Sequence, residues 1–108
     1  MTELPERPTL ADFQRYVAAL EIARGFTGES NVEKCLLLGE EIGELFKAVR
    51  KAEGIAIDAA SKVGSIPDEL ADVLIYVCAI ANRYGVDLEA AFKAKEQANR
   101  SRRWAKAG

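Results

Sequence analysis

The sequence predicts an all-α fold, a four-helix bundle that spans residues 1–108 as a single domain. Four segments combine apolar residues spaced three and four apart with recognisable helix caps, which is the pattern of amphipathic helices. No segment alternates polar and apolar residues strongly enough to indicate a strand. The length of 108 residues and the apolar content of 49% suit one small globular domain.

The first two helices have clear start signals. The first is expected to begin after Thr9, a suitable N-cap, and to end near Arg24, before the loop GFTGES. The second is expected to begin at the capping box formed by Ser30 and Glu33 and to continue to about Glu53, where a glycine follows. A loop with a short helical turn in its middle is expected after it.

The last two helices are bounded by proline, glycine and aspartate. Pro67 is expected at the first position of the third helix, which ends at Gly85. The fourth helix is expected to begin after Asp87 as N-cap and to run to about Trp104.

Charge and hydropathy exclude two classes of partner. With 15 basic and 17 acidic residues the net charge is −2, which argues against binding a nucleic-acid polymer through a basic face. The longest apolar run, Val73 to Ala81, is far too short to span a membrane. The polar N-terminal segment MTELPERPTL also lacks the pattern of a signal peptide.

The cysteines and the absence of histidine narrow the chemistry. Cys35 and Cys78 lie in apolar surroundings without CxxC spacing, so we interpret both as reduced core residues of a cytoplasmic protein. The chain contains no histidine, which removes the usual acid–base group at neutral pH and the commonest zinc ligand. Carboxylates that bind hard cations remain as the source of metal chemistry.

The third helix predicts self-association. From Leu70 to Ala81 every residue except Asp72 is apolar, and a helix that is apolar on all sides must be covered on all sides. Three partner helices from one small chain cover it poorly, so we expect a homodimer, and a homotetramer is compatible. The alternative is a monomer in which this helix is fully central.

Two pairs of acidic residues fall on or beside apolar helix faces. Glu41 points to the middle of the apolar stripe of the second helix, and Glu44 lies at its edge. Glu69 lies beside the apolar face of the third helix, with Asp72 one turn further on. This i, i+3 spacing brings two carboxylates close enough to share a cation, and Mg²⁺ or Mn²⁺ would remove the repulsion among all four. The alternative is a solvated acidic face whose ion-pair partners are Lys47 or Lys51.

These carboxylates lie in a longer motif. EEIGE at residues 40–44, followed after 24 residues by ELAD at residues 69–72, resembles the ExxE and ExxD signature of MazG-like all-α nucleotide pyrophosphohydrolases. Near the C-terminus, KEQANRSRRW resembles a family segment with lysine, asparagine and a basic residue, which here are Lys95, Asn99 and Arg102. The resemblance covers about residues 30–104.

The resemblance implies a dimeric or tetrameric enzyme that hydrolyses nucleoside triphosphates, often deoxynucleotides, to the monophosphate and pyrophosphate. It implies Mg²⁺ as cofactor, with Mn²⁺ as a substitute, and a house-cleaning role in the nucleotide pool. The metal ligands it implies are Glu41, Glu44, Glu69 and Asp72. Glu40 and Glu41 are the candidate catalytic residues. Glu40 either orients or deprotonates the attacking water or is simply solvated.

The C-terminal motif suggests a phosphate-binding group. Lys95, Asn99 and Arg102 are spaced to share one helix face, and together with the resemblance this favours contact with substrate phosphates. Other basic residues of this helix, such as Arg100, are better explained by interaction with the helix dipole. Arg83 is a weaker phosphate candidate.

Four aromatic residues are candidates for stacking on a base. Phe13 and Tyr16 are expected in the core instead, which leaves Phe26 and Tyr76.

Two other functions compete with hydrolysis of nucleoside triphosphates. One is a phosphoribosyl-ATP pyrophosphohydrolase-like enzyme, and the other is a non-enzymatic helical oligomerisation module with a structural cation. The C-terminal phosphate motif argues against the module, which would not need it.

Overall fold

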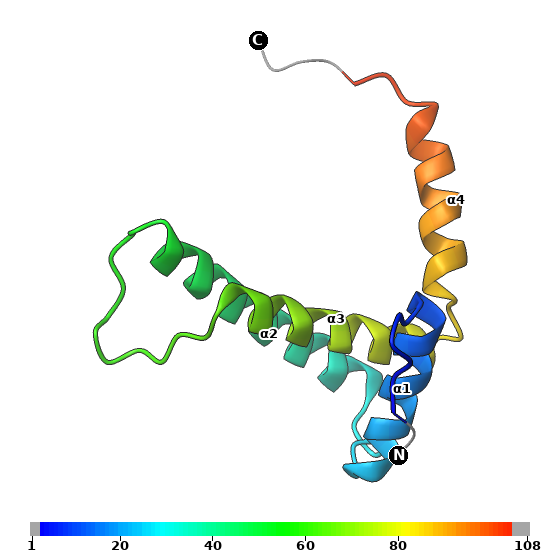
Figure 1. Ribbon diagram of the computed structural model, residues 1–108, viewed down its shortest axis with the longest axis horizontal. Coiled ribbons are helices and arrows are strands. Elements are labelled where there is room, and N and C mark those ends of the chain that lie inside the picture. The colour runs from blue at the N-terminus through cyan, green and yellow to red at the C-terminus, as the bar shows by residue number, and fades with distance from the viewer. Residues whose placement is uncertain (1–2, 105–108) are drawn as a thin grey trace.

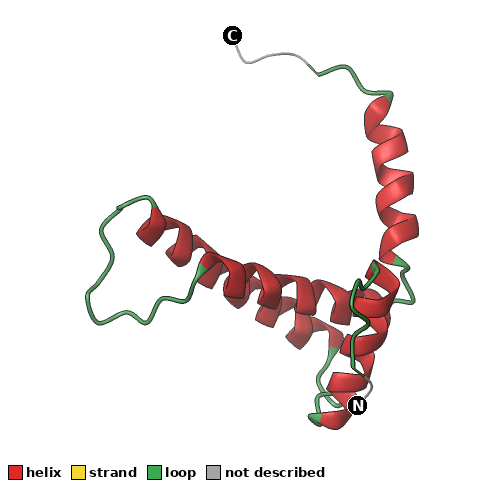
Figure 2. Cartoon of the chain, in the orientation of Figure 1, coloured by secondary structure: helices red, strands yellow, loops and turns green. Residues whose placement is uncertain are grey.

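The computed structural model describes residues 3–104 and contains four helices over that range: α1 (Leu10–Ala23), α2 (Asn31–Ala52), α3 (Ile66–Arg83) and α4 (Leu88–Arg100). No strand occurs among the described residues, and Figure 2 shows only helices and loops. The all-α class is therefore confirmed. Three bounds differ from expectation. Helix α3 begins one residue before Pro67 and ends at Arg83, two residues before Gly85, and α4 ends four residues before Trp104.

Each helix begins at a side chain that caps it. Thr9 and Asp12 form a reciprocal capping box at the start of α1. Ser30, Ser65 and Asp87 each accept a hydrogen bond from the backbone N–H three residues further on. These contacts satisfy N–H groups that have no partner inside the helix, so the start of every helix is fixed by local sequence.

The helices α2 and α3 run side by side in opposite directions, and α1 crosses them at one end (Figure 1). The core lies where α1 meets α3. It is built from Val17, Leu20, Cys78 and Ala79. Phe13 and Tyr16 pack against this core, as the sequence predicts. At the opposite end of the α2–α3 pair a long loop, residues 53–65, connects the two helices.

Helix α4 projects away from the other three (Figure 1). It contacts α1 and has no buried residue, and Phe92 on its surface is 69% exposed. The chain leaves α3 through a sharp turn at Gly85, whose φ of 63° suits glycine. The predicted four-helix bundle is therefore incomplete among the described residues, since α1, α2 and α3 pack together, whereas α4 joins them only at its start, where Leu88 packs against the core.

The shape of the chain is open. Its radius of gyration is 16.9 Å, whereas a compact domain of this length is expected near 13 Å. It exposes 8208 Å² of surface, whereas a compact monomer of this mass is expected to expose about 5,900 Å². Two chains that each buried this excess of about 2,300 Å² would share an interface of about 4,600 Å² in total, which lies in the range of obligate homodimers.

Large apolar side chains contribute to this excess. On α2, Leu36 and Phe46 are 67% and 62% exposed, and on α3 Leu70 is 51% exposed. Cys35 lies on the open side of α2 and is exposed, so the prediction that both cysteines are core residues is wrong for Cys35 and right for Cys78. The physical reason is that one chain lacks enough helices to cover both sides of α2.

Among the helices of residues 3–104, none combines the length and the apolar character that a membrane crossing requires.

Candidate metal centre

Three carboxylates from two helices converge. One oxygen each from Glu41 on α2 and from Glu69 and Asp72 on α3 lies within 4.8 Å of the other two. The packing of α2 against α3 brings the two predicted motifs together. We call Glu41, Glu69 and Asp72 the carboxylate cluster. Such closely grouped carboxylate oxygens are the donor set that Mg²⁺ and Mn²⁺ prefer, so the residues present fit a divalent cation.

The cluster is electrostatically strained in the absence of cations. Burial raises the pKa of Glu41 above its ordinary value, and the negative charges of Asp72 and Glu69 raise it further. No ion pair within the described residues involves any member of the cluster. A bound cation would reverse this balance, because it favours the ionised form of every carboxylate that faces it.

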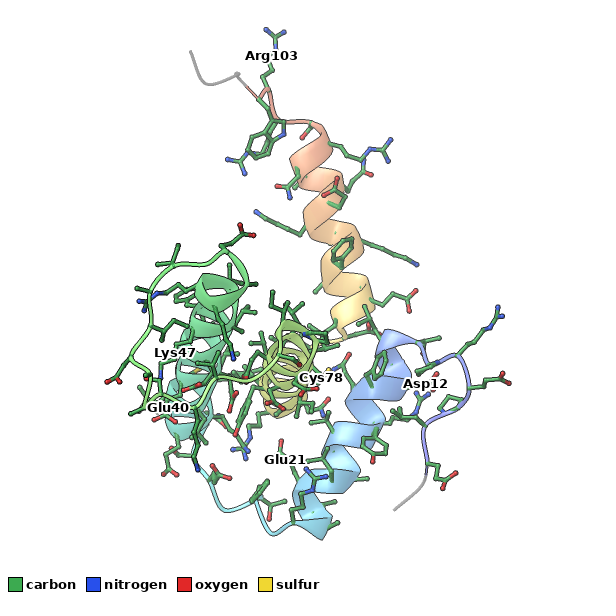
Figure 3. The ribbon with its side chains drawn as sticks, turned by 60° about the vertical axis from the view of Figure 1, so that its left-hand side comes forward. Asp12, Glu21, Glu40, Lys47, Cys78 and Arg103 are labelled. Carbon is green, nitrogen blue, oxygen red and sulfur yellow. The ribbon has the colours of Figure 1, made fainter. Side chains whose placement is uncertain are left out.

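Two predicted residues stand outside the cluster. Glu44 lies one turn from Glu41, but its carboxylate is half-exposed and pairs with Lys47 at 3.6 Å. This contact is one of those expected under the alternative of a solvated acidic face. Glu40 is exposed, and Figure 3 shows it on the edge of α2 that faces away from α3.

The loop before α3 reaches the cluster. Glu69 is only 9% exposed, and its side chain lies directly against Gly64. A Cβ atom at position 64 would come within 2.1 Å of Oε1 of Glu69. Gly64 therefore leaves the space that the carboxylate occupies. Sequence reasoning missed this residue because loop geometry does not follow from spacing.

A second charged group lies beside the first. Lys34 on α2 is 3% exposed, and its Nζ is 3.5 Å from Oε2 of Glu21 and 3.4 Å from Oε1 of Glu29. Arg83 on α3 donates to Oε2 of Glu21 at 3.0 Å. We call Glu21, Glu29, Lys34 and Arg83 the ion-pair cluster. Its two positive and two negative side chains balance one another.

The ion-pair cluster was not predicted, although one signal was present. Lys34 stands seven residues before Glu41 and so shares the buried stripe of α2. Arg83, a weaker phosphate candidate in the sequence, also donates to the carbonyl oxygens of Phe26 and Glu29. Its guanidinium therefore holds the loop between α1 and α2 against α3.

The C-terminal candidates lie apart from the carboxylates. Lys95 and Asn99 are on α4, which projects away from the α2–α3 pair (Figure 1). Arg102 follows the end of α4, where its guanidinium lies 4.8 Å from the centre of the Trp104 ring. The expectation that all three share a helix face is therefore wrong for Arg102, because the helix ends at Arg100. A single chain does not bring these residues to the cluster.

The fold and the cluster together define an all-α protein with a carboxylate site for divalent cations between two antiparallel helices. Residues 27–103 match the MazG nucleotide pyrophosphohydrolase domain. The chain belongs to this family.

Solved structures of MazG-like proteins are similar to this chain in sequence and fold. A MazG-like pyrophosphohydrolase of cyanophage S-2L, bound to dGDP and three catalytic Mn²⁺ ions per active site, is 34% identical with a TM-score of 0.70. The match covers 95% of this chain and 89% of that one. The iMazG protein of Vibrio DAT 722 is 32% identical with a TM-score of 0.60, over 85% of this chain and 98% of that one. A search of curated proteins found no match.

Proposed function

We propose that this protein hydrolyses nucleoside triphosphates, deoxynucleotides in particular, to the monophosphate and pyrophosphate in a reaction that depends on Mg²⁺. The observation that carries the proposal is the convergence of Glu41, Glu69 and Asp72 on one point between α2 and α3. Membership of the MazG family and the relative bound to dGDP and Mn²⁺ support a nucleotide substrate and divalent cations.

The chain's own part in the reaction is to hold charge and orient groups. When bound, divalent cations neutralise phosphate oxygens and make a water molecule nucleophilic near neutral pH. The residues that would hold them are Glu41, Glu69 and Asp72. Glu44 joins them when its side chain leaves Lys47, an exposed ion pair that stabilises the chain little. Glu40, next in sequence to Glu41, is assigned the orientation or deprotonation of the attacking water.

A second copy of the chain supplies the phosphate-binding residues in this proposal. Lys95, Asn99 and Arg102 are remote from the carboxylates of their own chain, because α4 projects away from the α2–α3 pair (Figure 1). The excess surface of the chain and the exposed apolar side chains of α2 and α3 support a homodimer, with a homotetramer as its extension. Basic groups there would bind the leaving pyrophosphate.

The cellular role proposed is house-cleaning of the nucleotide pool in the cytoplasm. Both cysteines are free, which is the usual state of thiols in a reducing compartment.

Pyrophosphate release tests the proposal. The full chain is incubated with each nucleoside and deoxynucleoside triphosphate in Mg²⁺, with added inorganic pyrophosphatase, and phosphate is measured with malachite green. The proposal predicts phosphate release that requires the pyrophosphatase and is lost in EDTA. Equal release without the pyrophosphatase would instead indicate cleavage of the terminal phosphate. No release with any nucleotide, in Mg²⁺ or Mn²⁺, would leave the chain as a helical module with a structural cation.

A further inference from the structure

Gly64 differs from the other glycines of residues 3–104 in what surrounds it. At each of the six others an added Cβ atom would meet nothing within 4 Å, whereas at Gly64 it would lie 2.1 Å from Oε1 and 3.2 Å from Cδ of Glu69. Backbone conformation does not explain this glycine, because the positive φ values occur at Gly25, Gly54 and Gly85 instead. Glycine at position 64 therefore leaves space for the Glu69 carboxylate.

The cap of α3 fixes Gly64 relative to Glu69. Ser65, the next residue, accepts a hydrogen bond from the N–H of Asp68 through Oγ at 3.2 Å. Its carbonyl oxygen accepts a second one from the N–H of Glu69 at 3.0 Å. These bonds satisfy the first turn of the helix, so the loop cannot draw back from Glu69 without breaking the cap. If position 64 carried a side chain, the side chain of Glu69 would have to move.

Packing, rather than an ion pair, holds the Glu69 carboxylate in the cluster. Glu69 is 9% exposed, and no ion pair within the described part of the chain includes it. The carboxylates of Glu41 and Asp72 carry the same charge and repel it. A displaced Glu69 side chain therefore has no partner of opposite charge that would restore its position.

The displacement is large on the scale of metal coordination. Because Cβ atoms essentially never lie within 3.0 Å of another atom, Oε1 of Glu69 would have to move by about 0.9 Å or more to clear a side chain at position 64. Distances between a bound cation and its ligand oxygens are held to within about 0.2 Å. Mg²⁺ in particular requires near-ideal octahedral geometry.

We propose that Gly64 is a positioning residue of the metal centre. Because it has no side chain, the Glu69 carboxylate occupies the place from which it shares a cation with Glu41 and Asp72. The loop of residues 53–65 thus takes part in metal binding although Gly64 supplies no ligand. This inference rests on the proposed function, since it concerns the cations of the same site, but it concerns their affinity and not the reaction.

Binding of Mn²⁺ in the absence of nucleotide tests the inference. Calorimetric titration of the metal-free full chain gives the dissociation constant for Mn²⁺, and urea denaturation in EDTA gives the stability. Gly64→Ala is expected to weaken Mn²⁺ binding by about tenfold or more, the usual effect of losing a group that orients a ligand. Its stability in EDTA should equal or exceed that of the wild type, because alanine restricts the unfolded chain more than glycine does.

Gly28→Ala is the matched control. Gly28 is also a loop glycine without a positive φ, and an added Cβ atom there would meet nothing within 4 Å. This variant should bind Mn²⁺ as the wild type does. Activity gives a second measurement, since the Mg²⁺ concentration for half-maximal turnover should rise in Gly64→Ala and not in Gly28→Ala. That concentration does not depend on how much of the protein is folded.

Three outcomes overturn the inference. The first is an unchanged dissociation constant for Mn²⁺ in folded Gly64→Ala. The second is a Gly64→Ala chain that is less stable than the wild type in EDTA or does not fold, which would show a structural role. The third is a wild type that does not bind Mn²⁺. If the chain hydrolyses no triphosphate, the proposed function fails, and the Mn²⁺ titration still decides the role of Gly64.

Discussion

The carboxylate cluster and the ion-pair cluster are neighbours that share α2 and α3, yet their charges are arranged in opposite ways. Glu21 and Glu29 meet Lys34 and Arg83, so each charge has a partner of opposite sign within 3.5 Å. Glu41, Glu69 and Asp72 meet one another instead. In a buried set of balanced charges, the loss of one member leaves its partner buried and uncompensated, whereas an unbalanced set is compensated only when a cation binds.

The largest expected effect comes from a variant in the carboxylate cluster. Asp72→Asn removes one of the three converging carboxylates and should lower kcat/KM for pyrophosphate release by about a thousandfold, because cations are no longer held at the reacting phosphate. Steady-state assays in Mg²⁺ measure this, with circular dichroism to check the fold.

Asp68→Asn is the matched control for that variant. Asp68 lies on the same helix, is exposed and stands outside the cluster. It should retain activity within about twofold of wild type, as expected for a surface charge removed from the site. Comparable activity in the two variants would show that the carboxylates do not hold the catalytic cations.

A variant in the ion-pair cluster should lower the stability of the fold. Lys34→Met leaves the carboxylates of Glu21 and Glu29 without an ammonium and should lower the free energy of unfolding by about 3–5 kcal/mol. Lys47→Met removes a lysine whose pair with Glu44 is half-exposed, so the expected loss is below about 1 kcal/mol. Urea denaturation at pH 7 distinguishes them, and equal losses would refute the structural role of the ion-pair cluster.

A smaller effect tests which residues bind the negatively charged phosphates of the substrate. The carboxylate cluster has no basic partner among the described ion pairs, so the proposed phosphate contacts come from the C-terminal segment. Arg102→Ala should reduce kcat/KM by about ten- to a hundredfold, the effect of losing a hydrogen bond to a charged group. Arg100→Ala removes the same charge and should change turnover little. Similar kinetics in both variants would assign the two arginines to the helix dipole instead.

The smallest effect concerns the pH dependence of the metal-free protein. The pKa of Glu41 is raised in the folded state from the ordinary value of 4.5. The folded chain therefore holds this proton more tightly than the unfolded chain does. The resulting stability is full below the unfolded pKa and is lost as the pH rises through the raised one. In EDTA, Glu41→Gln should remove this loss and melt slightly higher than wild type at pH 7.

Added Mg²⁺ should make the wild type melt at a higher temperature than Glu41→Gln, the reverse of the order in EDTA. It should raise the melting temperature of the wild type and leave Glu41→Gln nearly unchanged, because ligand binding to the folded state stabilises it. Melting curves recorded with and without Mg²⁺ measure both effects. A wild-type curve that is indifferent to Mg²⁺ would argue against a cation site.

The carboxylate cluster was accessible to sequence reasoning because its information is local. Caps fix where α2 and α3 begin, and helical spacing then indicates which carboxylates face the partner helix, correctly for Glu41, Glu69 and Asp72. It is not sufficient for Glu44, whose carboxylate pairs with Lys47 outside the cluster. The ion-pair cluster could not be predicted from the sequence, since its members come from α1, a loop, α2 and α3, far apart in sequence. The direction of α4 also escaped prediction. It depends on the turn at Gly85 and on the small contact that α4 makes with the other described helices, neither of which follows from periodicity.

The projecting α4 has a consequence for how the activity would be measured. If the phosphate-binding residues act on the neighbouring copy, each active site forms only when two chains meet. Turnover per mole of protein would then fall on dilution below the dissociation constant of the pair and recover when an inactive Asp72→Asn chain is added. The inactive chain would supply the phosphate-binding residues of its own α4 to the active site of a wild-type partner. A protein without activity of its own would therefore restore the turnover rate of a diluted active protein.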